Sequence, residues 1–259
     1  MNIDALKSFL DRKVEEYNRP IFINDDPVSV PHSFSLKQDI EISAFFAATF
    51  AWGNRTTIIN KSRELMRLMD NSPHQFITQH REEDLRRFEG FCHRTFNTTD
   101  LLYFISFLQA HYQKYSSLED AFTIPPVELD HKEPIESRLD NFYALFFSLE
   151  HVPLRTRKHV AAPSKNSACK RLNMYLRWMV RDDKKGVDFG LWKKIKQHEL
   201  ICPLDLHVAR VARKFGLVER PSADWQAALD LTRHLRSFDP TDPVKYDFAL
   251  FALGVIEKF

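Results

Sequence analysis

Glycine is unusually scarce in this chain, with six residues among 259, and no two glycines stand two or three positions apart. This spacing excludes the G-x-G-x-x-G turn of dinucleotide-binding folds and the glycine-rich loop of nucleotide hydrolases. Folds with many β-turns also depend on glycine, whereas helices punctuated by the 13 prolines of this chain do not. The sequence therefore predicts an all-α fold.

Apolar residues recur at helical spacing along most of the chain. The pattern predicts helices over residues 4–17, 36–51, 55–69, 99–115, 135–149, 167–181, 206–215, 223–237 and 243–256. We expect an extended stretch from Pro20 to Pro31, a loop over 123–134, and no sheet.

Cysteine and histidine give no sign of a metal site. The three cysteines stand far apart without a C-x-x-C pair, and the eleven histidines include no H-E-x-x-H spacing. We therefore predict no metal and no cofactor. An odd number of thiols, no signal-peptide core and no bilayer-length apolar run indicate a cytoplasmic protein without a membrane partner, which we expect to be a monomer.

Positive charge is concentrated in one segment. Residues 155–185 hold ten basic and two acidic side chains, a balance of +8, which leaves −6 for the rest of a chain whose net charge is +2. Such a segment is typical of a polyanion-binding surface or of a solvated helix face. Charge alone favours the solvated face.

Lys170 is the first candidate for chemistry. The predicted helix over 167–181, with Ser167 as its expected N-cap, places Lys170 in the first turn on a stripe shared with Arg177 and Arg181. The positive helix end and the arginines favour the neutral amine, which is a nucleophile that forms Schiff bases. The alternative is a lysine that merely faces solvent.

Asp205 is the second candidate. It follows Pro203 and precedes an apolar-periodic helix, so it is expected to be that helix's N-cap. Capping alone would explain the residue, but it would also hold the carboxylate rigidly at a helix start.

Together, a lysine in a first helical turn and the later segment Pro203-Leu204-Asp205-Leu206-His207 resemble the helix-hairpin-helix DNA glycosylase superfamily. The chain is most similar to an uncharacterised bacterial family related to the archaeal 8-oxoguanine DNA glycosylases. That likeness covers most of the chain, and the likeness to characterised glycosylases covers roughly the second half. The resemblance implies a glycosylase-like helical bundle in which residues 1–259 form one unit. Its two helical subdomains, 36–150 and 151–259, would flank a cleft, with 1–35 packing across them. The resemblance further implies a base-excision repair enzyme with AP lyase activity on damaged double-stranded DNA, with 8-oxoguanine as the expected lesion.

The resemblance also implies roles for individual residues. Lys170 would attack the sugar carbon that bears the base, and Asp205 would stabilise the positive charge that develops on the sugar. The expected base pocket consists of Met174, Trp52 and Phe248. The expected DNA contacts are Lys165, Asn166, Ser167, Arg171, Arg177, Asn54, Arg55 and Arg210. Each of these side chains also has an ordinary interpretation as core, helix cap or surface charge.

Two features depart from the superfamily pattern. The hairpin segment from Ala162 to Ser167 contains no glycine, so Asn166 is expected to adopt the positive φ of a tight turn. Lys170 and Asp205 are separated by 35 positions, which is longer than in common members. A non-catalytic DNA-binding module and an enzyme with another substrate therefore remain as alternatives to the glycosylase that we favour.

Overall fold

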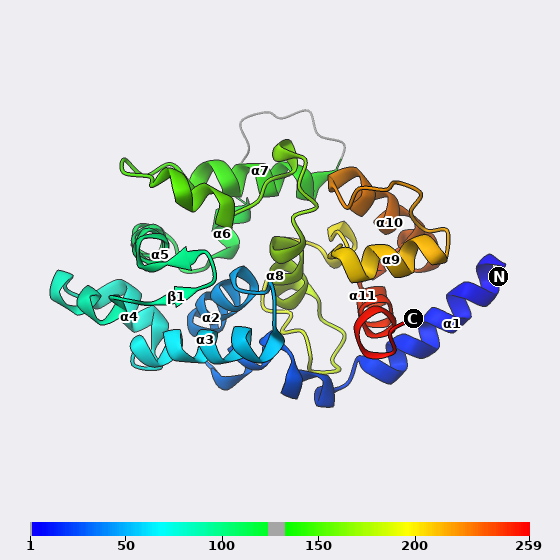
Figure 1. The fold of residues 1–259 in the computed structure, drawn as a ribbon, viewed down its shortest axis with the longest axis horizontal. Coiled ribbons are helices and arrows are strands. Elements are labelled where there is room, and N and C mark those ends of the chain that lie inside the picture. The colour runs from blue at the N-terminus through cyan, green and yellow to red at the C-terminus, as the bar shows by residue number, and fades with distance from the viewer. Residues whose placement is uncertain (1, 124–132) are drawn as a thin grey trace. The chain divides into compact units, whose positions relative to one another are not determined.

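The structure is a computed structural model that describes residues 2–123 and 133–259. Helices account for 65% of it and strands for 2%, which confirms the mostly helical fold (Figure 1). The chain forms two compact units. The described residues of the first unit are 2–24, 133–136 and 162–259, and those of the second unit are 25–123 and 137–161.

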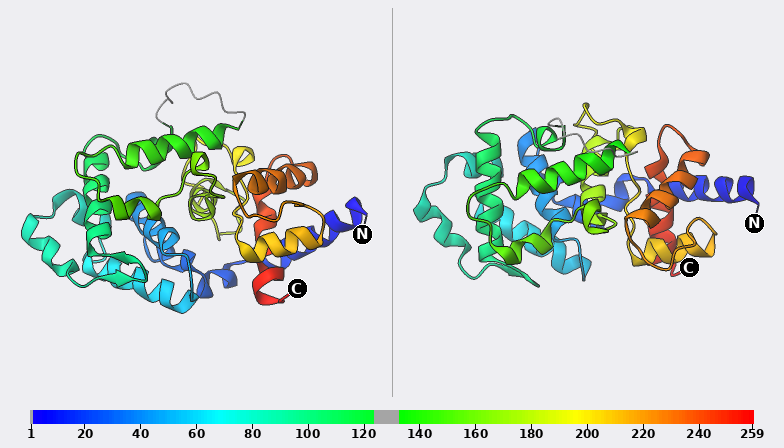
Figure 2. Two further views of the ribbon diagram at one scale, coloured as in Figure 1. Left: turned by 45° about the horizontal axis from the view of Figure 1, so that its top comes forward. Right: turned by 90° about the horizontal axis from the view of Figure 1, so that it is seen from above.

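This division differs from the expected one. The later boundary follows residue 161 rather than 150, and residues 2–24 belong to the same unit as the C-terminal half. The reason lies in helix α1 (Ile3–Tyr17), which buries Leu6 and Leu10 and packs beside α11 (Tyr246–Phe251) (Figure 2). Tyr246 also donates a 2.8 Å hydrogen bond to Asp11 of α1. The cleft between subdomains stays a prediction.

The first unit is built from short helices joined by tight turns. Its α-helices are α1, α8 (Lys170–Val180), α9 (Leu206–Lys214), α10 (Trp225–Phe238) and α11. Its 3₁₀ helices are η1 (Pro20–Asp25), η6 (Pro163–Lys165), η7 (Gln197–Glu199) and η8 (Pro243–Lys245), and the π-helix η9 (Ala252–Ile256) follows α11 directly.

The second unit contains the longer run of helices. Its α-helices are α2 (Lys37–Thr49), α3 (Arg55–Leu68), α4 (Pro73–Gln79), α5 (Thr98–Tyr112), α6 (Glu119–Thr123) and most of α7 (Pro134–Phe146). Its 3₁₀ helices are η2 (Pro27–Ser29), η3 (Pro31–Ser33), η4 (Glu82–Phe88) and η5 (Leu154–His159). The strands β1 (Cys92–His93) and β2 (Phe96–Asn97) pair antiparallel.

The proline-rich stretch is not extended, so that prediction is wrong. Residues 20–33 form three consecutive 3₁₀ helices, each with a proline at its first position. Proline suits this position because its φ is fixed near the helical value and its missing N–H would have no partner there. Asp26 stabilises the second of these turns by accepting the Val28 N–H at 3.0 Å.

The remaining helix predictions hold within a few residues at most ends. An exception is α8, which begins at Lys170 rather than near Ser167. The two-residue strands, α4, η4 and α6 were not predicted, because each is too short to show a period. The expected loop over 123–134 falls mostly on residues 124–132, which lie outside the described residues.

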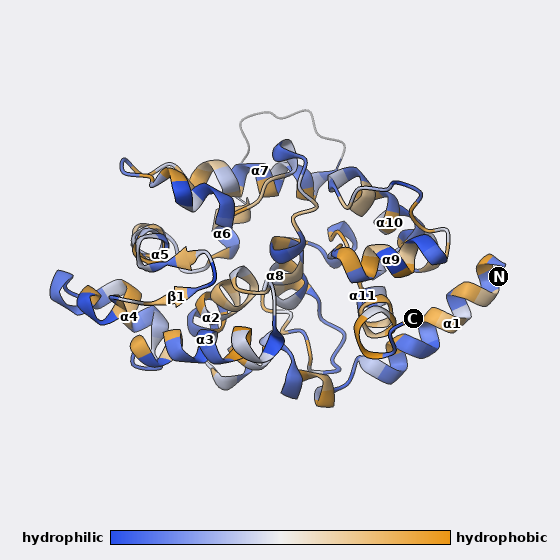
Figure 3. Ribbon diagram, in the orientation of Figure 1, coloured by the Kyte–Doolittle hydropathy of each residue, from blue (hydrophilic) through white to orange (hydrophobic). Residues whose placement is uncertain are grey.

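Phenylalanine rings form the core of the second unit. Phe45 of α2 stacks on Phe104 of α5 at a centroid distance of 5.5 Å, and Phe146 of α7 meets Phe104 edge-on at 4.7 Å. All three side chains are buried. Figure 3 shows the matching alternation of hydrophobic and hydrophilic segments along the helices. No helix in the described part of the chain has the length and hydrophobicity needed to cross a bilayer.

A buried ion-pair network ties the first unit together. Arg181, at the end of α8, is 1% exposed and pairs with Asp242 at 2.9 Å and with Asp188 at 3.0 Å. It also contacts Asp183 at 2.8 Å, whose carboxylate accepts a hydrogen bond from Asn18. The Arg181 guanidinium therefore joins the end of α8 to the loop that follows it and to the residue before η8. Through Asp183 it also reaches Asn18, at the end of α1.

Arg181→Ala should destabilise the first unit by about 3–5 kcal/mol, because it leaves buried carboxylates without their counter-charge. Thermal unfolding should show a fall of about 10 °C in melting temperature. The matched control is Arg233→Ala, which removes an exposed pair with Asp230 and should change stability by less than about 1 kcal/mol. Equal effects from both variants would contradict this role for Arg181.

Candidate functional site

The hairpin segment from Ala162 to Ser167, which precedes α8, turns without glycine. Asn166 has φ 56° and ψ 29°, which is the left-handed conformation predicted for it. Cys169, the residue before α8, also has a positive φ of 49°. The prediction that Ser167 is the N-cap of α8 is wrong, because the helix starts later, at Lys170. The Ser167 Oγ instead accepts the Cys169 N–H at 3.1 Å. The two left-handed residues turn the chain directly into Lys170.

Lys170 is the first residue of α8 and is half-buried. No described residue accepts a hydrogen bond from its Nζ, and no side chain caps the start of the helix. The first-turn N–H groups of α8 therefore have no side-chain acceptor, and they lie beside a lysine that is not committed to an ion pair. This arrangement suits a lysine that acts on a ligand.

Asp205 caps α9, as predicted. Its Oδ1 accepts the N–H of His207 at 2.8 Å and that of Val208 at 2.9 Å. The residue is half-buried, and no described residue donates to its Oδ2. The cap thus fixes the carboxylate while leaving one oxygen available.

Asp247 of α11 brings these two residues into one electrostatic neighbourhood. It is buried, and burial raises the pKa of Asp247 to about 6. Arg177 and Lys170 act in the opposite direction, and Asp205 adds to the rise. Burial also raises the pKa of the Cys202 thiol, and both Asp247 and Asp205 raise it further. Lys170 and Asp205 therefore act on the same buried carboxylate.

Arg177 has a different environment from the one expected. It is 4% exposed, forms a close ion pair with Asp247, and contacts Asp188 at 3.3 Å. Its guanidinium lies over the ring of Phe248 at 4.4 Å. The expected phosphate contact does not fit a buried guanidinium held by two carboxylates. Arg181, one turn further along, is likewise paired with carboxylates, Asp188 and Asp242.

Other predicted residues of the first unit have mixed environments. Met174, one turn after Lys170, is 9% exposed, and Phe248 is fully buried beneath Arg177, so neither side chain presents an open wall. Burial lowers the pKa of Arg171 to about 10. Arg210 donates a 2.8 Å hydrogen bond to the Gly254 carbonyl, and Lys165 is exposed on the hairpin.

Trp52, Asn54 and Arg55 belong to the second unit. Trp52 packs edge-on against His93 at 4.9 Å. Asn54 caps α3 by accepting the Thr57 N–H at 3.1 Å, and Arg55 is the first residue of that helix. Gly53 has φ 99°, and a Cβ there would overlap the Arg94 guanidinium. The junction is therefore a tightly packed helix connection, and its predicted contact with DNA stays a prediction.

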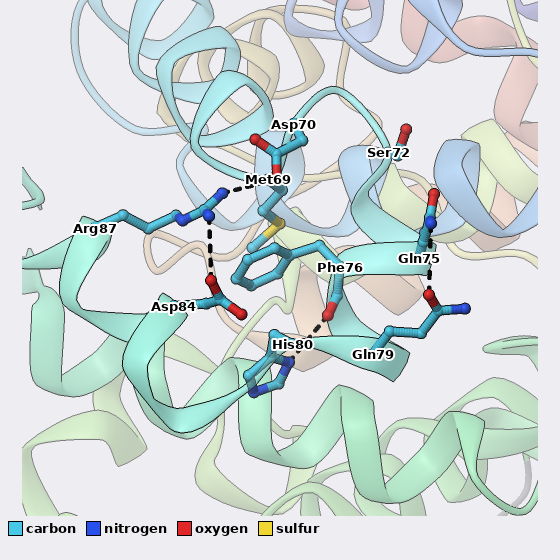
Figure 4. A pocket seen from close by; sticks show the side chains of 9 residues that line it. All are labelled: Met69, Asp70, Ser72, Gln75, Phe76, Gln79, His80, Asp84 and Arg87. Carbon is cyan, nitrogen blue, oxygen red and sulfur yellow. Dashed lines mark hydrogen bonds and ion pairs between the residues drawn. The ribbon is translucent and has the colours of Figure 1, made fainter.

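Two surface hollows contain none of the predicted site residues. The hollow in the second unit, of about 240 Å³, surrounds Phe76, which stacks on His80 and lies under Arg87 (Figure 4). Arg87 pairs there with Asp70 at 2.8 Å and with Asp84 at 3.4 Å, so the charges of this hollow largely neutralise one another. A hollow of about 490 Å³ beside α1 is likewise lined by ion-paired side chains, including Asp11 and Lys245.

The described residues contain no cluster of three or more histidine, cysteine, aspartate or glutamate side chains that could hold a metal ion. The chemistry available at the candidate site is therefore that of its own side chains: an amine at Lys170, a fixed carboxylate at Asp205 and a buried carboxylate at Asp247.

The chain belongs to the family described as "Protein of unknown function (DUF2400)", which matches residues 26–256. No curated protein and no solved structure matches the chain. The matched range includes Lys170, Asp205 and Asp247, so the whole candidate site lies within the part that defines the family.

Asp247 was not among the residues predicted from the sequence. It stands in an apolar segment, Tyr246 to Val255, where a single carboxylate at a buried helical position requires a buried cation. Arg177 and Arg181, four residues apart at the end of α8, could have indicated that partner.

The ionisation of Asp247 provides a direct test of the site. Lys170→Ala removes a nearby positive charge, so the pKa of Asp247 should rise above about 6. Asp205→Asn keeps the helix cap but removes a negative charge, so the same pKa should fall. Carbon-detected NMR titration of the side-chain carboxyl groups would measure both shifts. Lys193→Ala, which removes an exposed lysine paired with Asp182, is the control and should leave it unchanged. An Asp247 pKa that is insensitive to Lys170 and Asp205 would contradict the shared neighbourhood.

Proposed function

We propose that this protein is a base-excision DNA repair glycosylase with AP lyase activity, acting on oxidised purine in damaged double-stranded DNA. Lys170 is the nucleophile and Asp205 assists it. The observation that carries the proposal is that two helices meet α11, one beginning at Lys170 and the other capped by Asp205, 35 positions apart in the sequence. Arg177 of α8 pairs with Asp247 of α11, and α9 packs against α11. Neither side chain is consumed by a partner in the core, since the Lys170 Nζ and one Asp205 oxygen have no described partner.

The chemistry follows from an amine beside a fixed carboxylate. The Lys170 amine forms a bond to C1′ of the deoxyribose while the bond from C1′ to the base breaks and its electron pair leaves with the base. Asp205 stabilises the positive charge on the sugar during this step. The departing base gains a proton and the attacking amine loses one, so charge is balanced.

Strand cleavage follows from the same covalent bond. Opening of the sugar ring converts the C1′ adduct into a Schiff base with Lys170. Loss of a proton from C2′ then allows the C3′–O bond to break, and the 3′ phosphate leaves with the electron pair. A target base must leave the duplex stack for C1′ to reach the amine.

The hairpin and the start of α8 supply features suited to the DNA backbone. Lys165 and Asn166 are exposed, and the uncapped first turn of α8 presents N–H groups toward an anion. The choice of 8-oxoguanine depends on the resemblance to the archaeal glycosylases. A non-catalytic DNA-binding module would need the same hairpin but would not need the Lys170 amine.

Borohydride should trap a covalent complex between the protein and a duplex that carries an abasic site or 8-oxoguanine. Lys170→Ala should abolish this complex, because the variant lacks the attacking amine. Asp205→Asn should slow its formation by about 10²-fold or more, since the charge that stabilises the transition state is lost. Denaturing gels of the trapped complex, followed over time, would measure both effects.

Lys193→Ala is the matched lysine control and should trap DNA at the wild-type rate. DNA binding measured at several salt concentrations separates the alternatives, because backbone contacts weaken steeply with salt. Salt-dependent binding without any trapped complex would support the binding module instead of the enzyme. No DNA binding at all would contradict both functions.

A further inference from the structure

Gly254 stands where a helix would ordinarily favour alanine. It belongs to the π-helix η9, its φ is not positive, and glycine in a helix interior is less stable than alanine by about 1 kcal/mol. Its lack of a side chain must therefore serve packing. A Cβ at this position would lie 3.0 Å from the His207 carbonyl oxygen and 3.2 Å from the His207 Cβ.

The contact made by Gly254 is with the first turn of α9, which is the turn that Asp205 caps. His207 is held from both sides, because its backbone packs on Gly254 while its N–H donates to the Asp205 carboxylate at 2.8 Å. One turn later, the Arg210 guanidinium donates to the Gly254 carbonyl at 2.8 Å. Two separate contacts thus fix the start of α9 against η9.

The π register is the second unusual feature of this contact. The Glu257 N–H bonds to the Ala252 carbonyl five residues earlier, directly after the regular helix α11. Single π turns are rare and occur frequently at functional sites. Here α11 and η9 form one continuous element. Asp247 lies near its start, and Gly254, seven residues later, packs against α9, the helix that Asp205 caps.

We propose that Gly254, with Arg210, positions the Asp205 carboxylate by locking the first turn of α9 onto the π turn. Gly254 is a positioning residue, since it packs on His207, accepts the Arg210 hydrogen bond and acts through the cap. The inference rests on the proposed function for its catalytic consequence, but the mechanical link can be measured without DNA.

Gly254→Ala should slow single-turnover trapping of an abasic duplex by about 10- to 100-fold, because small displacements of a catalytic group cost rates of this size. Its Kd for DNA should stay within about twofold of wild type. Amide hydrogen exchange at His207 and Val208 should accelerate, since both N–H groups depend on the Asp205 cap.

Gly216→Ala is the matched control. Gly216 ends the same helix with φ 70°, and a Cβ there would meet nothing within 4 Å. The substitution should reduce stability through backbone strain by about 1 kcal/mol, yet leave trapping and the exchange of the two amides unchanged. It separates loss of stability from loss of position.

Arg210→Met provides a milder variant should Gly254→Ala fail to fold, and it should accelerate exchange of the same two amides. Arg213→Met, whose guanidinium bonds to the carbonyls of Arg220 and Pro221, should not. Unchanged exchange or unchanged trapping in Gly254→Ala overturns the proposal. If the wild-type protein traps no DNA but Gly254→Ala still accelerates exchange of the two amides, the proposed enzyme activity is contradicted. The link between Gly254 and the Asp205 cap is then still supported.

Discussion

Asp247 of the first unit is a buried carboxylate, so neighbouring side chains rather than water must balance its negative charge. Arg177 supplies the closest counter-charge, while Lys170 and Asp205 act on it with opposite sign. Because an unpaired buried charge is costly, the helices that carry these residues are held to one arrangement. α8, α9 and α11 therefore meet around a single negative group.

Ion pairs within the fold account for part of the positive charge of the basic segment, residues 155–185. Four of its ten basic residues pair with acidic residues from outside it, namely Arg155 with Asp100, Arg177 with Asp247, Arg181 with Asp242, and Lys185 with Glu15. The +8 balance is thus partly an internal feature of the fold. The exposed lysine of the hairpin, Lys165, remains available to a polyanion.

Local signals predicted much of what the structure shows. A proline followed by an aspartate before an apolar period predicted the cap at Asp205, and the absence of glycine predicted a left-handed Asn166. The 3₁₀ turns at Pro20, Pro27 and Pro31 escaped prediction, because proline suits a short helix start as well as extended chain. The burial of Arg177 and Arg181 also escaped it, since their acidic partners Asp242 and Asp247 are over 60 positions away.

In the proposed reaction the amine of Lys170 forms a covalent bond to deoxyribose. Peptide mapping by mass spectrometry, after borohydride reduction with an abasic duplex and digestion of protein and DNA, tests it most directly. We expect the mass of a reduced sugar remnant on Lys170 and on no other amine. A remnant on the N-terminal amine or on another lysine such as Lys165, or an unmodified Lys170, would contradict it.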